Sequence, residues 1–301
     1  MRVVVTGGAG FIGSHLVDAL VAHDHQVHVL DNLATGSRDV VNAAAAFHEG
    51  DIRSDAAAQF ADTQPEVVFH LAAQADVGTS VRRPDYDAEV NVVGTVRVLE
   101  AARASGAQVV FSSTGGAIYG ECDGPAAEDA PRRPISPYGV AKLCAEEYLA
   151  GWNRLHGTGH VTLRFANVYG PRQAASLEGG VVAIFLERLA AGDGGTIFGD
   201  GRQTRDFVFV ADVVSALLAA AGHPGGVFNV GTGIETSVSE LHAACRRAAG
   251  VELEPAYAPA RAGDALRSVV SPARADRELG WRAETSLAEG LARTWAWTAG
   301  A

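Results

Sequence analysis

The chain has 301 residues, of which 48% are hydrophobic and 20% charged, and its formal net charge is −11. This length and apolar content are enough for one large core or two smaller ones. The acidic balance argues against nucleic acid and against an acidic membrane surface as partners. No apolar stretch approaches the roughly 20 residues of a membrane span. The first motif starts at the second residue, so we expect neither a signal peptide nor a membrane segment, and a cytoplasmic protein.

Strand and helix patterns alternate through the first half of the chain, which predicts βαβ units and a parallel sheet. The expected strands cover residues 2–6, 26–30, 45–48, 66–71, 107–112 and 160–165. The expected helices cover residues 12–22, 54–62, 85–104 and 137–156. The sequence therefore predicts an α/β fold with a Rossmann-type, doubly wound parallel sheet.

The first strand ends in a glycine-rich turn, TGGAGFIG at residues 6–13, that leads directly into a helix. Gly7 permits a tight turn with positive φ, Gly10 lets the backbone approach a pyrophosphate, and Gly13 lets the helix pack closely on the strand. The pyrophosphate then accepts hydrogen bonds from N–H groups at the start of the helix. The cofactor contacts expected here are Gly7, Gly10, Phe11, Ile12 and Gly13.

The second strand is followed by Asp31, whose carboxylate can accept hydrogen bonds from the adenosine ribose hydroxyls. It would repel the 2′-phosphate of NADP, so the predicted cofactor is NAD. Three glycines alone can simply mark a tight turn. Their position, the flanking strand, the following helix and Asp31 together argue against that interpretation.

Tyr138 and Lys142 are four residues apart in the expected helix 137–156, so they share one face. An ammonium beside a phenol stabilises the phenolate and lowers a pKa that is normally about 10. We therefore expect Tyr138 to act as a base near neutral pH. The same spacing is common in exposed helical pairs, and its place downstream of a dinucleotide fingerprint favours the functional interpretation.

A cluster of hydroxyls, Ser112, Ser113 and Thr114, stands at the end of the strand 107–112. Such hydroxyls can reach a substrate oxygen and the nicotinamide, or they can make ordinary hydrogen bonds at a strand end. Cys122, Cys144 and Cys245 are too few and too scattered for a disulfide framework or a zinc site, so we expect packing residues and no metal.

Beyond residue 170 the pattern becomes irregular. It contains a glycine-rich stretch 192–201, a strand 207–210, a helix 211–221, a strand 227–230 and a proline-rich stretch 255–272. We expect two units: an NAD-binding domain and a smaller lobe over the carboxyl ends of the strands, with the substrate between them. The domain would comprise residues 1–170 and about 206–232, and the lobe residues 171–205 and 233–301.

These features resemble the extended short-chain dehydrogenase/reductase family, and within it the UDP-glucose (UDP-galactose) 4-epimerases. The resemblance covers essentially the whole chain. Besides the glycine turn, the hydroxyl cluster, Tyr138 and Lys142, it rests on Asp31-Asn32, Asp51-Ile52, HLAA at 70–73, RFANVYGPR at 164–172, FGDGRQTRDFV at 198–208 and RAGD at 261–264.

The resemblance implies a tightly bound NAD. Asp51 and Ile52 would border the adenine, Ala72 and Ala73 would line the nicotinamide ribose side, and Lys142 would bridge Tyr138 and that ribose. The further cofactor contacts that it implies are Asn32, Leu71, Asn91, Ser112 and Phe165.

The resemblance also implies a UDP-sugar substrate and 4-epimerisation through a transient 4-keto sugar. Tyr138 would take the proton from the hydroxyl on carbon 4 while the hydride passes to NAD, and the keto sugar would then present its other face. Thr114 would bond the same oxygen, with Ser113 as a second candidate because the cluster is one residue longer than usual. The implied substrate contacts are Thr114, Tyr138, Asn167, Val181, Val182, Phe198, Arg205, Arg261, Asp264 and Ser268.

Within this set, Arg205 and Arg261 would neutralise the diphosphate, and Asp264 would accept from the uridine ribose. In the family that the chain resembles, epimerases restricted to plain hexoses carry a Tyr at the position of Ser268. The smaller Ser side chain would leave space for an N-acetyl group on the sugar. A glucuronate epimerase remains an alternative, although such enzymes typically have Thr in place of Asn167 and Arg in place of Ala174. Arg188 could still reach a carboxylate from elsewhere.

Two different activities compete with epimerisation. A dehydratase or decarboxylase of the same fold is disfavoured because Gly115 and Gly116 stand where a dehydratase has an acidic pair. An NAD-binding regulatory protein without chemistry would have no use for Tyr138, Lys142 and Thr114.

We also expect a homodimer, formed by a four-helix bundle of the helices 85–104 and 137–156 from two subunits. The apolar residues Leu143, Tyr148, Leu149 and Trp152 could equally pack inside one subunit.

Overall fold

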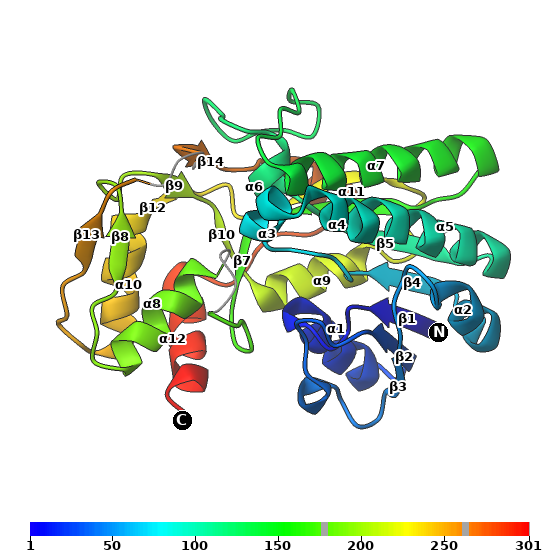
Figure 1. The fold of residues 1–301 in the computed structure, drawn as a ribbon, viewed down its shortest axis with the longest axis horizontal. Coiled ribbons are helices and arrows are strands. Elements are labelled where there is room, and N and C mark those ends of the chain that lie inside the picture. Colours follow the sequence, from blue (N-terminus) through cyan, green and yellow to red (C-terminus); the bar gives the residue numbers. More distant parts are fainter. Residues whose placement is uncertain (176–179, 261–264, 301) are drawn as a thin grey trace.

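A seven-stranded sheet of parallel strands organises the larger part of the molecule (Figure 1). The computed structural model describes residues 1–175, 180–260 and 265–300. The strands are β1 (Arg2–Thr6), β2 (Gln26–Asp31), β3 (Ala46–Glu49), β4 (Val67–His70), β5 (Gln108–Thr114), β6 (Val161–Phe165) and β11 (Gly226–Val230). Their order is β3-β2-β1-β4-β5-β6-β11, and every neighbouring pair is parallel. The first six follow the Rossmann order, which confirms the predicted fold class.

Helices cover both faces of this sheet, so its central strands are buried on both sides and read as apolar runs. One face packs on α1 (Phe11–Ala22), α9 (Val210–Ala220) and α11 (Ala273–Leu279). The other face packs on α2 (Ala56–Thr63), α5 (Gly94–Ser105) and α7 (Pro137–His156). Shorter elements at the strand ends and in the connections are η1 (Arg38–Val40), α3 (Val77–Arg82) and α6 (Gly115–Ile118).

The helix expected at 85–104 is interrupted. The chain forms α4 (Pro84–Ala88), then the π-helical turn η2 (Glu89–Val93), then α5. A π turn adds a residue to the helical circuit and is frequent at functional sites. Apolar periodicity does not reveal it, because the flanking turns keep their helical spacing.

A smaller lobe packs its own core from α8 (Val181–Ala190), α10 (Val238–Ala249) and α12 (Leu287–Thr298). Short strands complete the lobe and its junction with the sheet. They are the pair β7 (Asn167–Tyr169) and β10 (Phe207–Phe209), the pair β8 (Thr196–Phe198) and β13 (Ala256–Ala258), and the trio β12 (Thr236–Ser237), β9 (Thr204–Arg205) and β14 (Arg267–Ser268). The expected strand 207–210 is therefore present as β10, but it pairs with β7 outside the main sheet.

One segment departs from the expected division into domain and lobe. Val270, Ala275 and Trp281 are buried in the core of the large sheet, and Trp281 Nε1 donates to Asp212 O at 2.9 Å. α11 accordingly packs against β11 of the sheet, while Figure 1 shows α12 in the lobe. Within the described ranges, no helix combines the length and the apolar character that crossing a membrane requires.

Candidate active site

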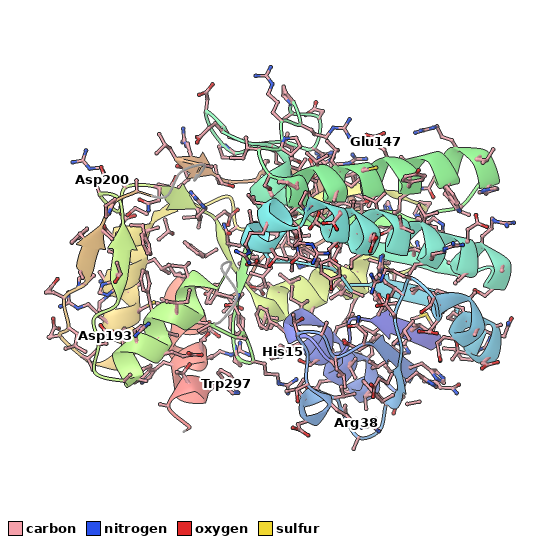
Figure 2. All side chains as sticks on the ribbon, viewed as in Figure 1. His15, Arg38, Glu147, Asp193, Asp200 and Trp297 are labelled. Carbon is pink, nitrogen blue, oxygen red and sulfur yellow. The ribbon has the colours of Figure 1, made fainter. Side chains whose placement is uncertain are left out.

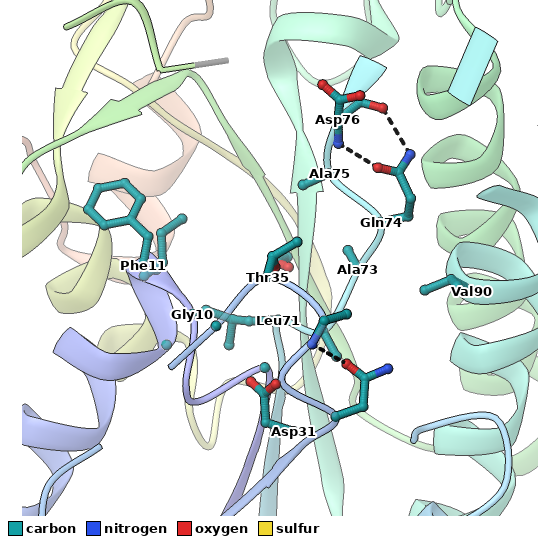
Figure 3. Close-up of a pocket in the computed structure, with 18 of the residues that line it drawn as sticks. Gly10, Phe11, Asp31, Thr35, Leu71, Ala73, Gln74, Ala75, Asp76 and Val90 are labelled. Carbon is teal, nitrogen blue, oxygen red and sulfur yellow. Dashed lines mark hydrogen bonds between the residues drawn. The ribbon is translucent and has the colours of Figure 1, made fainter. Parts of the chain in front are cut away.

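A cavity of about 700 Å³ opens at the carboxyl ends of the strands (Figure 3). Open α/β sheets bind their ligands at this edge, and the volume falls within the usual range for a small-molecule site. The cavity gathers nearly all of the expected cofactor residues. They are Gly7, Gly10, Phe11, Ile12, Gly13, Asp31, Asn32, Asp51, Ile52, Leu71, Ala72, Ala73, Ser112, Tyr138, Lys142 and Phe165, together with Ser113.

The glycine turn has the geometry that the sequence predicts. Gly7 has a φ of 74°, in the left-handed region, and a Cβ there would stand 2.6 Å from Ala72 N. A Cβ on Gly13 would stand 2.1 Å from Gly7 O. The start of α1 can therefore lie directly on β1 only because these positions have no side chain, and its first N–H groups face the cavity without helical partners.

Asp31 ties the glycine turn to the end of β2. Its Oδ2 accepts from Ala9 N at 2.9 Å and its Oδ1 from Leu33 N at 2.8 Å. Each oxygen keeps a lone pair for a ribose hydroxyl. Nearby, hydrogen bonds from Arg53 lower the pKa of Asp51 to about 2. The expected adenosine end of the cavity is thus lined by two carboxylates.

The three clustered hydroxyls point to different partners. Ser112 Oγ donates to His70 O at 3.0 Å, and Ser113 Oγ donates to the buried Glu146 at 2.5 Å. Thr114 is the one that bonds the Tyr138 side chain. Since the proton of Ser113 is already directed to Glu146, the geometry favours Thr114 over Ser113 as the partner of a substrate oxygen.

Ser136 caps the helix that carries Tyr138 and Lys142, because its Oγ accepts from Gly139 N at 3.2 Å and Pro137 opens the first turn. The expectation that Lys142 lowers the pKa of Tyr138 is wrong. Desolvation of the phenol, reinforced by the charge of Asp87, raises the pKa of Tyr138, and the bond from Thr114 only partly opposes this.

The Lys142 ammonium is held against β5. Its Nζ donates to Ser112 O at 3.0 Å and lies 4.8 Å from the centre of the Phe111 ring. Burial lowers the pKa of Lys142 to about 8, against the opposing charges of Asp87 and Glu146. Spacing on a helix fixes the shared face of two residues, whereas packing against β5 decides where the long side chain ends.

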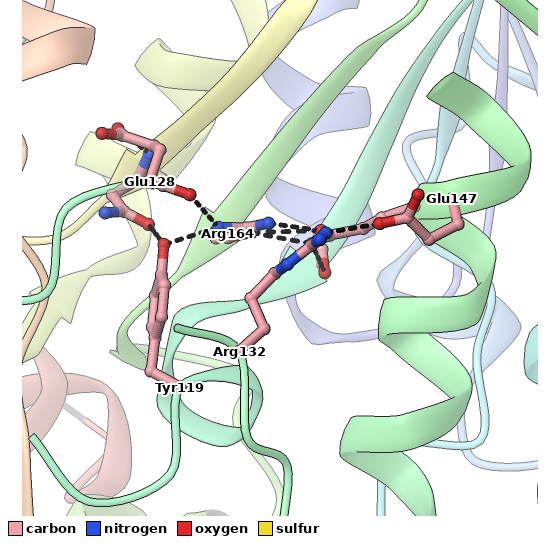
Figure 4. Close-up of polar contacts among 8 residues, drawn as sticks. Tyr119, Glu128, Arg132, Glu147 and Arg164 are labelled. Carbon is pink, nitrogen blue, oxygen red and sulfur yellow. Dashed lines mark hydrogen bonds and ion pairs between the residues drawn. The ribbon is translucent and has the colours of Figure 1, made fainter. Parts of the chain in front are cut away.

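A buried polar network is bonded to the end of β5, the strand that carries the hydroxyl cluster (Figure 4). Arg164, which is 2% exposed, pairs with Glu146 at 2.6 Å and donates to the Tyr119 hydroxyl at 2.7 Å. Tyr119 in turn donates to Asn229 Oδ1 at 2.7 Å. The sequence patterns assigned no role to Glu146 or Tyr119. The one sign that the sequence offers for such residues is a charged or polar side chain among the apolar residues of a helix or strand.

The loop after β4 forms one wall of the cavity, and Asn91 fastens it. Asn91 Oδ1 accepts from Gln74 N at 3.0 Å, and its Nδ2 donates to Gln74 O at 2.8 Å. Asn91 is 2% exposed and does not line the cavity itself, unlike Gln74 and Val90. Figure 3 shows the two bonds by which Gln74 is also held to Asp76.

Apart from Thr114 and Tyr138, the expected substrate residues that the structure describes lie in the lobe or at its junction with the sheet, and the cavity lining does not include them. Arg205 of β9 pairs in register with Ser268 of β14, and the buried Ser268 donates to Gly116 O at 3.5 Å, two residues from Thr114. Asn167 N donates to Asp206 O at 2.9 Å. Val181 and Val182 begin α8, with Val182 in the lobe core, and Phe198 ends β8. Arg261 and Asp264 lie outside the described residues.

Several lining residues belong to no motif recognised in the sequence. Thr35 and Gly36 follow Asp31 in the same connection and could have been found by extending that motif. Others come from segments without any motif, namely Gln74, Ala75, Asp76, Thr79, Arg82, Tyr86, Val90, Val168, Gln173, Ala174 and Gly180.

The residues present fit NAD. A glycine cradle without room for a Cβ stands at one end of β1, a carboxylate stands at the end of β2, and a hydroxyl, a phenol and an ammonium stand at the end of β5 and the start of α7. Over the described ranges, no group of three or more His, Cys, Asp and Glu side chains is placed to hold a metal ion.

Known proteins resemble this chain over its whole length. A model of the NAD dependent epimerase/dehydratase family matches residues 3–231. A UDP-glucose 4-epimerase of Mycolicibacterium smegmatis is 49% identical, with 98% of this chain and 97% of the relative covered. A crystal structure of the Thermotoga maritima UDP-glucose 4-epimerase with UDP-glucose has a TM-score of 0.96 and 46% identity, covering 99% and 98% of the two chains. The Thermus thermophilus UDP-glucose 4-epimerase with NAD has a TM-score of 0.96 and 44% identity over 100% of both.

Proposed function

This chain belongs to the NAD dependent epimerase/dehydratase family, and from that premise we propose that it is an isomerase, a UDP-glucose 4-epimerase that works with bound NAD. The observation that carries the proposal is that Tyr138 and Lys142 line one end of a cavity whose other end is a dinucleotide cradle, with Thr114 next to the phenol. Full-length relatives with this activity support it.

The residues around the cavity divide the binding of NAD between them. The N–H groups at the start of α1 would hold the pyrophosphate, and Asp31 would accept from the adenosine ribose. Lys142 would hold the nicotinamide ribose, and the wall 71–76 would flank it. When bound, NAD supplies a hydride acceptor and a positive charge close to the phenol.

Tyr138 is the residue that moves the proton. It takes the proton from the hydroxyl on carbon 4 of the sugar and later returns it to the same oxygen of the 4-keto sugar. Thr114 bonds that oxygen and keeps the phenol oriented. Desolvation raises the pKa of Tyr138, and the positive charge that NAD would place beside the phenol would act in the opposite direction.

The substrate diphosphate would be held by Arg205 and Arg261, and Asn167 would contact it from β7. Asp264 would accept from the uridine ribose, with Val181, Val182 and Phe198 completing the uridine side. Holding the diphosphate while leaving the hexose unclamped would let the keto sugar present either face to the same nicotinamide and take the hydride back.

The side chain at position 268 decides which sugars fit in this proposal. Ser268 is buried beside Gly116, close to Thr114. A hydroxymethyl side chain there leaves room beside the hexose, so we infer that UDP-N-acetylglucosamine is accepted as well as UDP-glucose. The pair Gly115 and Gly116 next to Thr114 offers no acid for the elimination of water, which supports epimerisation rather than dehydration.

Proton NMR tests the proposal directly. The purified protein is incubated without added cofactor with UDP-glucose, UDP-N-acetylglucosamine or UDP-glucuronate, and the anomeric signals are followed. We expect the 4-epimers of the first two and none of the third. No conversion by protein with confirmed bound NAD would contradict the epimerase proposal, and conversion of UDP-glucuronate alone would move it to the glucuronate enzymes.

We also propose a homodimer built on α7 and its neighbour α5. A groove of about 310 Å³ along α7 is lined by Cys144, Glu147, Tyr148, Gly151, Trp152 and Leu155. Tyr148 is 40% and Leu155 74% exposed, and Trp152 Nε1 is buried without a hydrogen-bond partner. Figure 2 places Glu147 on the outer side of the same helix. Leu149 is different, since it packs in the subunit's own core.

The mass in solution tests the dimer. We expect a species of twice the subunit mass at micromolar concentration, and Leu155→Glu should shift it to the monomer because the charge would be buried. A clean monomer of the unaltered protein would refute the dimer.

We propose a cytoplasmic location on chemical grounds, because Cys122, Cys144 and Cys245 are all free thiols.

A further inference from the structure

Asp206 is a buried carboxylate between β9 and β10 to which the proposed reaction assigns no part. It is 1% exposed. Its Oδ1 accepts from Thr232 Oγ1 at 2.6 Å and from Thr232 N at 2.9 Å, and its Oδ2 accepts from Gly233 N at 3.0 Å. Burial raises the pKa of Asp206, and these hydrogen bonds oppose the rise. Both carboxylate oxygens are therefore bonded within the protein.

The donors of these bonds lie directly after β11, the edge strand of the large sheet. The chain passes so close to the carboxylate there that a Cβ on Gly231 would collide with Asp206 Oδ2. Thr232 Oγ1 in turn accepts from Ile234 N at 3.1 Å, which closes the turn around the carboxylate. The side chain of Asp206 thus fastens its own segment to the end of the sheet.

The backbone of Asp206 bonds to the segments that carry expected substrate residues. Its C=O accepts from Asn167 N at 2.9 Å, and its N–H donates to Ser268 O at 3.1 Å. Arg205 precedes Asp206 in the chain and pairs in register with Ser268. These three residues form the proposed substrate surface, and each is linked to Asp206 by one peptide bond or one backbone hydrogen bond.

We propose that Asp206 is a positioning residue for the substrate, whose carboxylate anchors the substrate surface to the end of β11. The inference rests on the epimerase function proposed above. The substrate surface comes from β7, β9 and β14, which have only two or three residues each. Groups that bind a ligand must be held to within about 0.5 Å. Strands this short need an anchor, and charge-assisted bonds to backbone N–H groups are a strong one.

Asp212 is a buried carboxylate of the same kind in a different place. It is 6% exposed, and it accepts from Glu284 N at 3.3 Å and from Thr285 N at 3.1 Å. These bonds connect α9 to the segment before α12, and neither carries an expected substrate residue. Loss of either carboxylate should destabilise the fold, whereas only the loss of Asp206 should disturb the substrate surface.

The affinity for UDP, measured by calorimetry on the NAD-loaded protein, is the first test. Asp206→Asn replaces an acceptor oxygen by an amide that donates, so the turn after β11 has to move. We expect UDP to bind about 10-fold more weakly and the KM for UDP-glucose to rise by a similar factor. The NAD content and kcat should change little, because the lost interaction is one of ground-state binding. Asp212→Asn should leave both the UDP affinity and KM unchanged.

Thermal unfolding separates positioning from a structural defect. Both Asp206→Asn and Asp212→Asn should lower Tm, because each leaves buried N–H groups without their charged acceptor. If Asp206→Asn lowers Tm and the yield of active protein but leaves the UDP affinity and KM unmoved, its role is structural alone and the proposal is overturned.

Thr232→Val is a milder variant of the same anchor. It removes the hydroxyl that donates to Asp206 Oδ1 and keeps the carboxylate and the backbone donors. We expect a smaller weakening of UDP binding in the same direction. This variant keeps the test decisive if Asp206→Asn does not fold, because an unchanged UDP affinity in Thr232→Val would then refute the anchor.

The outcomes separate this proposal from the proposed function. A protein that binds UDP but epimerises no UDP-sugar contradicts the proposed function, and its UDP affinities still test Asp206. An active protein whose Asp206→Asn variant binds UDP as tightly as the unaltered chain contradicts only the role of Asp206. A protein that does not bind UDP contradicts both.

Discussion

The two ends of the site are built in different ways. The cofactor end lies on the ends of long buried strands, and its glycine turn and Asp31 come from the first 31 residues. The substrate end is carried by strands of two or three residues, such as β9 and β14, that meet only in the folded lobe. Under the proposed function, the cofactor would be held on a fixed framework and the substrate would be received on a separately packed surface.

Tyr138→Phe tests the point where the two ends meet. Both ligands should still bind, because the phenol belongs to neither the glycine cradle nor the diphosphate contacts. Loss of the general base should lower kcat about 10³-fold. NMR turnover assays give kcat, and absorbance of the released nucleotide gives the NAD content. Near-normal turnover in this variant would refute Tyr138 as the base.

Arg205→Ala tests the substrate end alone. Loss of a charge-assisted bond to the diphosphate should raise the KM for UDP-glucose roughly 10- to 100-fold. The content of bound NAD should not change, because β9 takes no part in the cradle. Arg202→Ala is the matched control, since that side chain is 90% exposed only three residues away. An equal rise in KM for the control would show that general surface charge, not Arg205, attracts the substrate.

Ser268→Tyr tests the substrate end through the size of a side chain rather than through its charge. A phenol at this buried position should occupy the space beside the hexose and lower kcat/KM for UDP-N-acetylglucosamine about 10-fold relative to UDP-glucose. The ratio of the two values, measured in one preparation, corrects for any loss of folded protein. An unchanged ratio would place the N-acetyl group away from Ser268.

Gly13→Ala tests the cofactor end. The new Cβ would meet Gly7 O at 2.1 Å, so α1 must shift off β1, at a cost of about 1–3 kcal/mol. We expect a several-fold smaller fraction of NAD-loaded protein and a lower Tm, with the KM of the loaded fraction unchanged. Gly124→Ala, where a Cβ meets nothing within 4 Å, is the control. Full NAD content in Gly13→Ala would contradict the cradle.

Sequence patterns predicted much of one end of the cavity lining residue by residue, because the motifs there are local. Gly7 and Gly13 have the backbone roles predicted for them, and α7 begins and ends where the pattern places it. The pKa of Tyr138 was predicted in the wrong direction, because the pattern contained Lys142 but neither the desolvation of the phenol nor the distant Asp87. The sequence pattern also could not decide between Ser113 and Thr114, because the choice depends on the hydrogen bond that Ser113 donates to Glu146.

The sequence by itself determined the sheet, the glycine cradle and the face shared by Tyr138 and Lys142, because each depends on spacing along one or two neighbouring elements. Only the tertiary structure decided where the Lys142 ammonium ends, which hydroxyl faces the phenol, and that a π turn sets Asn91 against Gln74. Those features depend on contacts between segments tens of residues apart. Burial then fixes both the hydrogen-bond partners of these groups and their charge.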